Sequence, residues 1–278
     1  MAMYLGSKKV AVTNTVEKQV PSMKAFFEAG GKCAYGNATS FEGCWQYDDT
    51  ANVTDMSKMF YYCSNITTVP LFDTSNVTDM GSMFYRCSKL TTVPLFDTSK
   101  VTNMGSMFER CSIITTVPRF DTAKVTNMSY IFYNCSNLTT VPQLDTSNVT
   151  SMSSMFSSCA ELTTVPLFDT SKVTNMGSMF YFCLNLTTVP LLDTSKVTNM
   201  SDMFHGCSNL ETIHMININA NLNISASTKF TREALLEIIG NLKAQTSGNK
   251  KLTMGATNLA KLTEEDKAIA TNKGWTLA

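Results

Sequence analysis

One string of 24 letters is repeated along most of the chain without a change in length. Copies similar to DTSKVTNMGSMFERCSIITTVPRF begin at seven aspartates with no insertion between them: Asp49, Asp73, Asp97, Asp121, Asp145, Asp169 and Asp193. A fixed period of this kind is the sequence signature of a solenoid, in which each copy forms one coil and contacts only its neighbours. The repeat constrains the fold more than any other feature of the 278 residues.

The apolar letters recur at the same places in every copy. In the copy that begins at Asp73 they are Val77, Met80, Met83, Phe84, Cys87, Leu90, Val93 and Phe96. One short coil cannot bury these side chains alone, whereas stacked coils join them into a continuous core. We therefore expect the invariant letters to pack inside and the variable letters to face the solvent.

Each copy contains segments that favour different local structures. The LTTV segment is typical of a short strand, and strands of the seven copies are expected to stack in parallel about 4.8 Å apart, over roughly 29 Å. The DTSN segment predicts a turn, and GSMFYRC is long enough for about one turn of helix. A proline cannot donate to a ladder, so we place the proline column at the strand's end. This column contains Pro70, Pro94, Pro118, Pro142, Pro166 and Pro190.

The regions that flank the repeat are expected to cap it, because an uncapped end would expose its core to water. At the front, YLGSKKVAV predicts a hairpin, and a short helix is expected from Ser22 to Gly30. At the back, we predict a helix after Thr231, a strand in KLTMG, a second helix after Thr263 and a last strand at Trp275. The expected divisions are an N-terminal cap at 1–48, the solenoid at 49–216 and a C-terminal cap at 217–278.

The repeat resembles the BspA-like class of bacterial leucine-rich repeats, specifically the FDTSNVTDMSxMFxxCSxLT variety of bacterial and mycoplasma surface proteins. The resemblance covers Asp49 to about Ile213, although CSKLTTVPLFD is two residues shorter than the family form of this segment. It implies an α/β leucine-rich-repeat solenoid of stacked short parallel strands, with seven 24-residue coils and a cap at both ends. It also implies adhesion or recognition at a bacterial surface, with a protein or a glycan as partner.

The cysteines form a column with one member in each copy: Cys63, Cys87, Cys111, Cys135, Cys159, Cys183 and Cys207. Neighbours about 4.8 Å apart satisfy the Cα spacing of a disulfide, but an odd number cannot pair completely. The C-x-x-C spacing of a zinc site is missing. Because neighbouring Phe and Leu side chains would not stabilise a thiolate, we expect buried free thiols. A pair between Cys33 and Cys44 stays open.

The aspartate column and the two histidines have both functional and structural interpretations. Asp73, Asn76 and Asp79 carry oxygen atoms suited to calcium, but neither an EF-hand loop nor the glycine-rich calcium repeat matches. A row of turns is therefore expected, and no metal. His205 and His214 are not accompanied by a nucleophile elbow, a phosphate loop or a zinc-protease helix. We predict neither an enzyme nor a cofactor.

Charge and hydropathy argue against two classes of partner. The 22 Lys and Arg residues balance the 22 Asp and Glu residues, and nothing in this total recruits nucleic acid. The chain contains no run of about 18 apolar residues, and its opening lacks the apolar stretch of a secretory signal. We expect no membrane insertion and no signal peptide in this chain.

The letters that change between copies are the candidate binding residues. They occupy the two positions between the invariant Phe and Cys, and the position after the proline. Packing cannot require both Arg and Leu at equivalent places, so these columns are expected to face the solvent, where Tyr and Arg are enriched in interaction hot spots. Ordinary surface variation is the alternative. The predicted ligand-binding residues are Tyr61, Tyr62, Tyr85, Arg86, Arg110, Arg119, Tyr133, Gln143, Tyr181 and Phe182.

The sequence therefore predicts a non-enzymatic, adhesin-like binding module that recognises a protein or glycan at a bacterial cell surface. A rigid array holds its side chains in fixed rows, so that little side-chain entropy is lost on contact. The alternative is a bacteriophage virion component, such as a tail-tip or fibre-associated receptor-binding protein. It is suggested by the loose similarity of the YLGSKKV opening to phage tail-associated proteins. The sequence indicates neither the ligand nor the oligomeric state.

Overall fold

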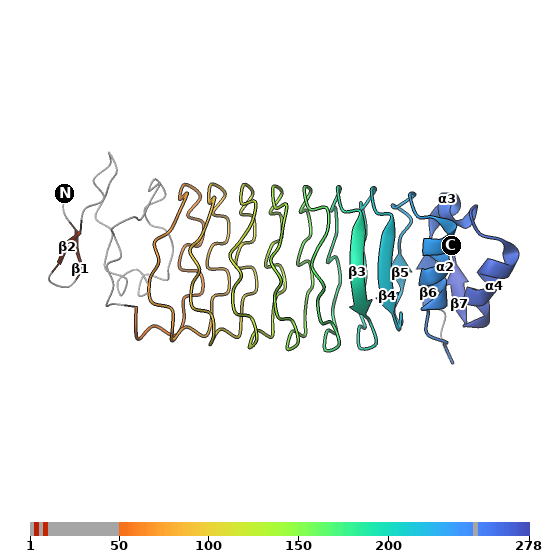
Figure 1. Ribbon diagram of the computed structural model, residues 1–278, viewed down its shortest axis with the longest axis horizontal. Coiled ribbons are helices and arrows are strands. Elements are labelled where there is room, and N and C mark those ends of the chain that lie inside the picture. The colour runs from red at the N-terminus through yellow and green to blue at the C-terminus, as the bar shows by residue number, and fades with distance from the viewer. Residues whose placement is uncertain (1–2, 6–7, 11–49, 247–249) are drawn as a thin grey trace.

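The computed structural model describes residues 3–5, 8–10, 50–246 and 250–278. Figure 1 shows the chain from residue 50 onward as a nearly straight row of stacked coils that ends in several helices. Strands β1 (Met3–Leu5) and β2 (Lys8–Val10) form the antiparallel hairpin predicted from YLGSKKVAV. The predicted helix at 22–30 and the open pairing of Cys33 with Cys44 lie outside the described residues.

Equivalent residues of successive copies lie side by side. Parallel bridges run from Asp55 to Asp79 and on through residues 103, 127, 151 and 175 to Asn199. Next to these bridges, the backbone N–H of Thr102 donates to the carbonyl oxygen of Thr78 at 2.8 Å, and the Thr102 hydroxyl donates to the same oxygen. The 24-residue period of the sequence is therefore the period of the stack, and the chain is a repeat solenoid.

The strand prediction for the LTTV segment is wrong for most copies. Regular strands occur there near the C-terminal end of the array, where β3 (Thr188–Asp193) pairs in parallel with β4 (Thr212–Ile216). In the copies between residues 88 and 187 this segment holds no strand. Coils still touch at its first threonine, where Thr91 N–H donates to Thr67 O at 2.9 Å. The proline column explains the interruption, because each proline lacks the N–H that a continuous ladder needs.

Pro190 lies within β3, so its predicted place at the strand's end is wrong. Val189 is opposite Ile213 and Leu192 is opposite Met215, which leaves Pro190 and Leu191 facing one residue of β4. This two-against-one arrangement is a β-bulge. Proline fits there because the bulge interrupts the ladder at the position where the N–H is missing.

The GSMFYRC segment forms tight turns, so the prediction of a helical turn is wrong. Cys87 N–H donates to Phe84 O within the coil, whereas the N–H groups of Ser82 and Arg86 donate to the next coil. Ser82 and Arg86 have φ values of 57° and 58°, in the left-handed region. A helix would satisfy its N–H groups internally and leave none to join the coils.

The interior follows the invariant letters, as predicted. All eight apolar positions named for the copy at Asp73 are buried. The ring of Phe132 stacks on Phe108 with centroids 5.9 Å apart and on Phe156 at 5.7 Å, and the same stack extends from Phe60 to Phe204. A second row of phenylalanines lies against the first, with Phe120 at 6.2 Å from Phe108.

The residues after the repeat form a three-stranded sheet with helices. The strands are β5 (Leu222–Asn223), β6 (Lys250–Thr253) and β7 (Trp275–Leu277), paired in parallel in that order. The helices are α2 (Arg232–Gly240), α3 (Gly255–Leu259) and α4 (Glu264–Asn272). The predictions for α2, β6, α4 and β7 are confirmed.

Two features fix these helices. Thr231 is the N-cap of α2 and accepts the Ala234 N–H, whereas Thr263 and Asp266 form a reciprocal capping box at α4. Arg232 donates two hydrogen bonds, at 2.7 and 2.8 Å, to the carboxylate of Asp266 and so joins α2 to α4. The role of this region as a cap and the bounds of the three predicted regions stay predictions.

Candidate functional site

The two variable residues between the invariant Phe and Cys lie on the second of the tight turns. The second member of each pair is in the left-handed region, with φ of 54–62° in six copies and 78° at Gly206. That backbone conformation costs a residue other than glycine about 1 kcal/mol. A coil-to-coil hydrogen bond holds it, as from Arg86 N to Glu109 O at 2.7 Å. The backbone thereby fixes where these side chains leave the coil.

The structure brings most of the predicted site residues together on four neighbouring coils, in two sets of contacts that the backbone hydrogen bond from Arg86 N to Glu109 O joins, and we call this surface the tyrosine–arginine cluster. The Tyr61 ring stacks on Tyr85 at 4.6 Å and meets the edge of Tyr62 at 4.7 Å. The Arg86 guanidinium lies over the Tyr62 ring, 4.9 Å from its centre. The cluster consists of Tyr61, Tyr62, Tyr85, Arg86, Glu109, Arg110, Tyr130 and Tyr133.

Two members of this cluster were missing from the predicted site. Tyr130 contacts Tyr133 with ring centroids 5.7 Å apart, and Glu109 lies 3.9 Å from Nε of Arg110, whose guanidinium is 5.8 Å from the Tyr133 ring centre. Tyr130 occupies a column that holds Ser in four of the seven copies, and Glu109 occupies a column that holds Tyr in four. For both residues, the signal in the sequence is that they differ from the residue type most common at their position in the repeat.

The arginine side chains of the cluster are held by contacts with aromatic rings more than by hydrogen bonds to acceptor atoms. Arg110 Nε lies 3.9 Å from the Glu109 carboxylate, whose side chain is only 13% exposed. Within the described residues, the Nε atoms of Arg86 and Arg110 are buried without a hydrogen-bond partner. A guanidinium over a ring gains a cation–π interaction that does not use its N–H donors. The terminal nitrogens therefore stay suited to bind an acceptor on a partner.

The Tyr61 phenol of the cluster is an uncharged donor at neutral pH. Burial, with smaller contributions from Tyr62, Tyr85 and Glu109, raises the pKa of Tyr61 above its usual value. A neutral Tyr combines an apolar ring with a hydroxyl that donates and accepts hydrogen bonds. This surface can therefore contact both apolar faces and polar groups of a ligand.

Tyr181 and Phe182 belong to a separate group. The Tyr181 ring meets Phe182 edge-on at 4.7 Å and stacks on His205 at 5.0 Å. Ser157 and Ser158 occupy the equivalent positions between this group and the tyrosine–arginine cluster, and they carry no ring. The single extended row that the sequence suggested is therefore divided into two aromatic groups.

Arg119 and Gln143 lie in the other variable column, after the prolines. Both are exposed, and Gln143 Nε2 donates to the carbonyl oxygen of Leu167 at 2.6 Å. Among the residues that the structure describes, neither makes a hydrogen bond, ion pair or ring contact with the two aromatic groups. The structure thus separates these two residues from the rest of the predicted site.

A polar groove of about 340 Å³ lies beside the tyrosine–arginine cluster and spans the same coils. Its lining includes Asp79, Asn103, Asn127 and the serines of the first tight turns. Tyr130 belongs to both the groove and the cluster, so the two surfaces are continuous. The sequence interpretation did not anticipate this groove.

Glycines and asparagines together shape the groove. The Asn127 side-chain amide donates to Asn103 Oδ1 at 3.1 Å, and the same oxygen accepts the Gly105 N–H at 3.0 Å. A Cβ atom on Gly105 would lie 2.8 Å from Asn127 Nδ2. In the sequence, this packing of glycine against asparagine corresponds to a glycine that is followed 22 residues later by an asparagine. The pattern occurs at Gly81, Gly105 and Gly177.

We expect Gly105→Ser to lower the free energy of unfolding by about 1–3 kcal/mol, because the added side chain overlaps Asn127. The double variant Gly105→Ser/Asn127→Ser should recover most of this loss. The chain already contains such a pair, in which the hydroxyls of Ser129 and Ser151 lie 2.7 Å apart. Urea unfolding of both single variants and the double variant measures the coupling. Additive effects within about 0.5 kcal/mol would contradict this account.

The cysteine column consists of buried thiols that are not joined in disulfides, as predicted. Cys111 Sγ donates to Phe84 O at 3.1 Å, and Cys207 Sγ donates to Phe180 O at 2.9 Å. Burial raises the pKa of Cys135 far above that of an exposed thiol, and raises that of Cys207 to about 12. The thiols are therefore protonated packing groups that also supply one weak hydrogen bond per coil.

A family model identifies the repeat. The model described as "Mycoplasma protein of unknown function, DUF285" matches residues 22–140, 110–214 and 165–231, most of the chain. The chain belongs to the DUF285 family. No curated protein matches this DUF285 chain.

Three solved structures are similar to the DUF285 chain. The Treponema pallidum (T. pallidum) leucine-rich repeat protein is 20% identical with a TM-score of 0.36, covering 83% of this chain and 81% of that one. A leucine-rich cell surface protein from Faecalibacterium prausnitzii is 15% identical with a TM-score of 0.22, over 57% and 75%. A leucine-rich-repeat protein from Bacteroides ovatus is 12% identical with a TM-score of 0.21, over 81% and 88%.

The aspartates that begin each copy of the DUF285 repeat form turns, as predicted. The Asp97 carboxylate accepts the Ser99 N–H at 3.0 Å, and this contact recurs in successive coils. Hydrogen bonds from the Ser99 backbone and hydroxyl hold the pKa of Asp97 below its usual value. Among the described residues, no group of three or more His, Cys, Asp or Glu side chains is placed to hold a metal ion.

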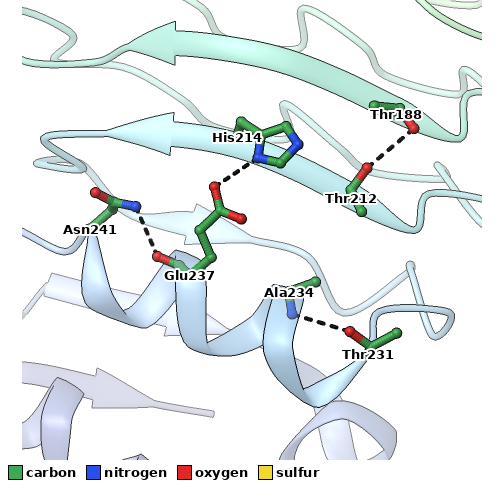
Figure 2. Close-up of polar contacts among 7 residues, drawn as sticks. All are labelled: Thr188, Thr212, His214, Thr231, Ala234, Glu237 and Asn241. Carbon is green, nitrogen blue, oxygen red and sulfur yellow. Dashed lines mark hydrogen bonds and ion pairs between the residues drawn. The ribbon is translucent and has the colours of Figure 1, made fainter.

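His214 links the repeat to the helices that follow it. Figure 2 shows its Nδ1 atom, on β4, 2.7 Å from the Glu237 carboxylate on α2. Both side chains are more than 40% exposed. The Asn241 amide donates to the Glu237 carbonyl oxygen at 3.0 Å and closes the end of α2. In the described part of the DUF285 chain, no helix is long and apolar enough to span a bilayer.

Proposed function

We propose that this protein is a non-enzymatic recognition module of a bacterial cell surface, which binds a protein or glycan through the tyrosine–arginine cluster and the adjoining polar groove. The observation that carries the proposal is the stacking of arginine on tyrosine across neighbouring coils, as between Arg86 and Tyr62 at 4.9 Å. Side chains that are already ordered lose little entropy on binding. The likeness of the repeat to bacterial surface proteins supports the location.

The groove and the cluster offer complementary chemistry. Amide and hydroxyl groups of Asn103, Asn127 and Ser82 line the groove and match the hydrogen-bonding groups of a sugar or a peptide backbone. The Tyr rings provide flat apolar faces, and the guanidiniums provide directional donors. Tyr and Arg are the residue types on which binding energy concentrates in protein interfaces.

The test is a triple variant, Tyr85→Ser/Arg86→Asn/Arg110→Asn. Each new residue is one that the chain itself has at an equivalent position, in Ser157 and Asn134. Asn134 already adopts the left-handed conformation, with φ of 55°, so the turns are preserved. The variant should therefore fold normally and lose only one tyrosine ring and two arginine charges of the cluster.

Binding is measured on a glycan array and on immobilised host extracellular-matrix proteins. We expect the triple variant to lose at least tenfold in affinity for the best-bound probe. The matched control is Arg119→Ser/Gln143→Ser in the other column, which should bind that probe like the wild type. Equal binding by the triple variant, at unchanged melting temperature, would refute the proposal.

A further inference from the structure

The column that follows the prolines carries an unexpected pattern of polarity. Along the stack it reads Leu71, Leu95, Arg119, Gln143, Leu167 and Leu191. The four leucines are 57%, 60%, 57% and 47% exposed in that order. Single exposed leucines are ordinary, but leucines in line on one face form an apolar stripe that favours contact with another molecule.

From either end, this column has the same order: two leucines, two polar residues and two leucines. We propose that two copies of the chain associate antiparallel and face to face along this stripe, about a two-fold axis between Arg119 and Gln143. Leu71 of each copy then meets Leu191 of the other, and Leu95 meets Leu167. A two-fold contact requires such a self-complementary patch.

The polar centre of the stripe is complementary in hydrogen bonding. Both amide hydrogens of Gln143 are used within the chain, by the carbonyl oxygens of Leu167 at 2.6 Å and Leu144 at 3.3 Å. Its Oε1 atom has no partner among the described residues, and the side chain is exposed. Arg119 has only donors. In the antiparallel pair, the Arg119 guanidinium of each copy lies opposite the Gln143 oxygen of the other.

Other alignments are disfavoured. Parallel copies in register would place Arg119 against Arg119, and a shift by one coil would place a leucine against Arg119 or Gln143. Like-charge contacts and unpaired polar groups against leucine reject such alignments. The nearly straight row of coils in Figure 1 allows the whole stripe to make contact at once.

The stripe is short, which suggests a weak dimer. It ends at Leu191, because the next coil has the single residue His214 opposite Pro190 and Leu191, and His214 is paired with Glu237. Six coils about 4.8 Å apart give a stripe of roughly 24 Å. Interfaces below about 1,200 Å² in total are typical of weak association, so we expect dissociation constants in the micromolar range. The tyrosine–arginine cluster is not part of this contact.

Sedimentation velocity of the full chain from 1 to 200 µM, with a reductant to exclude cystine links, tests the proposal. We expect a reversible monomer–dimer equilibrium, which Leu95→Asp weakens at least tenfold. Tyr62→Ser, at a comparably exposed apolar side chain outside the stripe, should leave it unchanged. A chain that is monomeric throughout this range, or a dimer indifferent to Leu95→Asp, would overturn the proposal, and the stripe would then fit a different protein.

A charge exchange tests the antiparallel register itself. Gln143→Arg should weaken the dimer at least tenfold, because it places two arginines opposite each other. Arg119→Glu/Gln143→Arg should restore or strengthen it, since each introduced acid faces the introduced base of the other copy. In a parallel dimer the double variant would place like charges together. Failure of the double variant to restore association, with melting temperatures unchanged, would rule out the proposed register.

Discussion

Raising the pH from 8 to 10 should unfold most of the protein. Burial raises the pKa of the thiols of Cys111, Cys135, Cys159, Cys183 and Cys207 in the folded chain. In the unfolded chain the same thiols ionise with a pKa of about 8.5. The folded state therefore retains protons that the unfolded state releases, and the free energy of unfolding falls as the pH rises.

The expected size of this effect is large. The stabilisation is fully present below about pH 8.5 and is lost progressively as the pH rises toward the folded-state pKa values, which lie above that point. At pH 10 each buried thiol contributes a loss of about 2 kcal/mol, and five such thiols together give about 10 kcal/mol. That loss is comparable to the whole stability of a typical domain, about 5–15 kcal/mol.

Urea unfolding followed by circular dichroism from pH 7 to 10.5, in the presence of a reductant, measures the effect. The slope at the alkaline end should approach about −7 kcal/mol per pH unit, from five thiols at about 1.4 kcal/mol each. The variant Cys135→Ala should have a slope smaller by about 1.4 kcal/mol per unit, which separates the thiols from other titrating groups. Constant stability up to pH 10 would show that the column is not buried as described.

The core of this fold is readable from the sequence because each position occurs many times. Phe84 and Cys87 have an identical residue at the equivalent position of every coil. Such invariance is required only where a side chain fills a buried space of fixed shape. Two of the three helices after the repeat, α2 and α4, were predictable for a different reason. Thr231, Thr263 and Asp266 satisfy backbone N–H groups at helix ends, and this requirement is local in sequence.

The path of the backbone between these positions was harder to predict. Ser82 and Arg86 lie in the left-handed region, yet neither residue type favours it. Only Asn134 and Gly206 in the Arg86 column, and Asp202 in the Ser82 column, are residue types that indicate it. The conformation is imposed by hydrogen bonds to the next coil, such as Arg86 N to Glu109 O, which local propensity does not contain. The strand prediction for LTTV failed because it rested on residue propensity. It ignored that the proline in nearly every coil has no backbone N–H to donate.

The candidate site was predicted in composition but not in arrangement. The post-proline column is exposed, as predicted, but the two columns between Phe and Cys are mostly half-buried, and Ser157 is buried. Ser157 and Ser158 also divide the aromatic row, and the post-proline column lies apart from it. The groove was missed because it arises from missing Cβ atoms at Gly81 and Gly105, a feature that a search for binding side chains overlooks. The phage alternative stays a prediction, since nothing in the fold bears on it.

The stacked phenylalanines make Phe132→Ala the most damaging single substitution that we expect in the core. Its ring contacts Phe108 at 5.9 Å and Phe156 at 5.7 Å, so truncation removes two ring contacts and leaves a cavity between coils. Phe→Ala changes in cores cost about 3–5 kcal/mol. Because each coil is stabilised only by its neighbours, a cavity in the middle of the array also weakens the coupling between its two halves.

A matched pair of milder substitutions distinguishes the stack from simple burial. In the second phenylalanine row the chain itself has Leu144 and Leu192, so Phe120→Leu should cost less than about 1.5 kcal/mol. Phe132→Leu should cost more, because the first row is phenylalanine in every coil and loses two stacking contacts worth about 0.5–1.5 kcal/mol each. Urea unfolding, with hydrogen exchange to detect separate opening of the two halves, measures both effects. Equal losses for the two leucine variants would mean that the stack contributes only buried area.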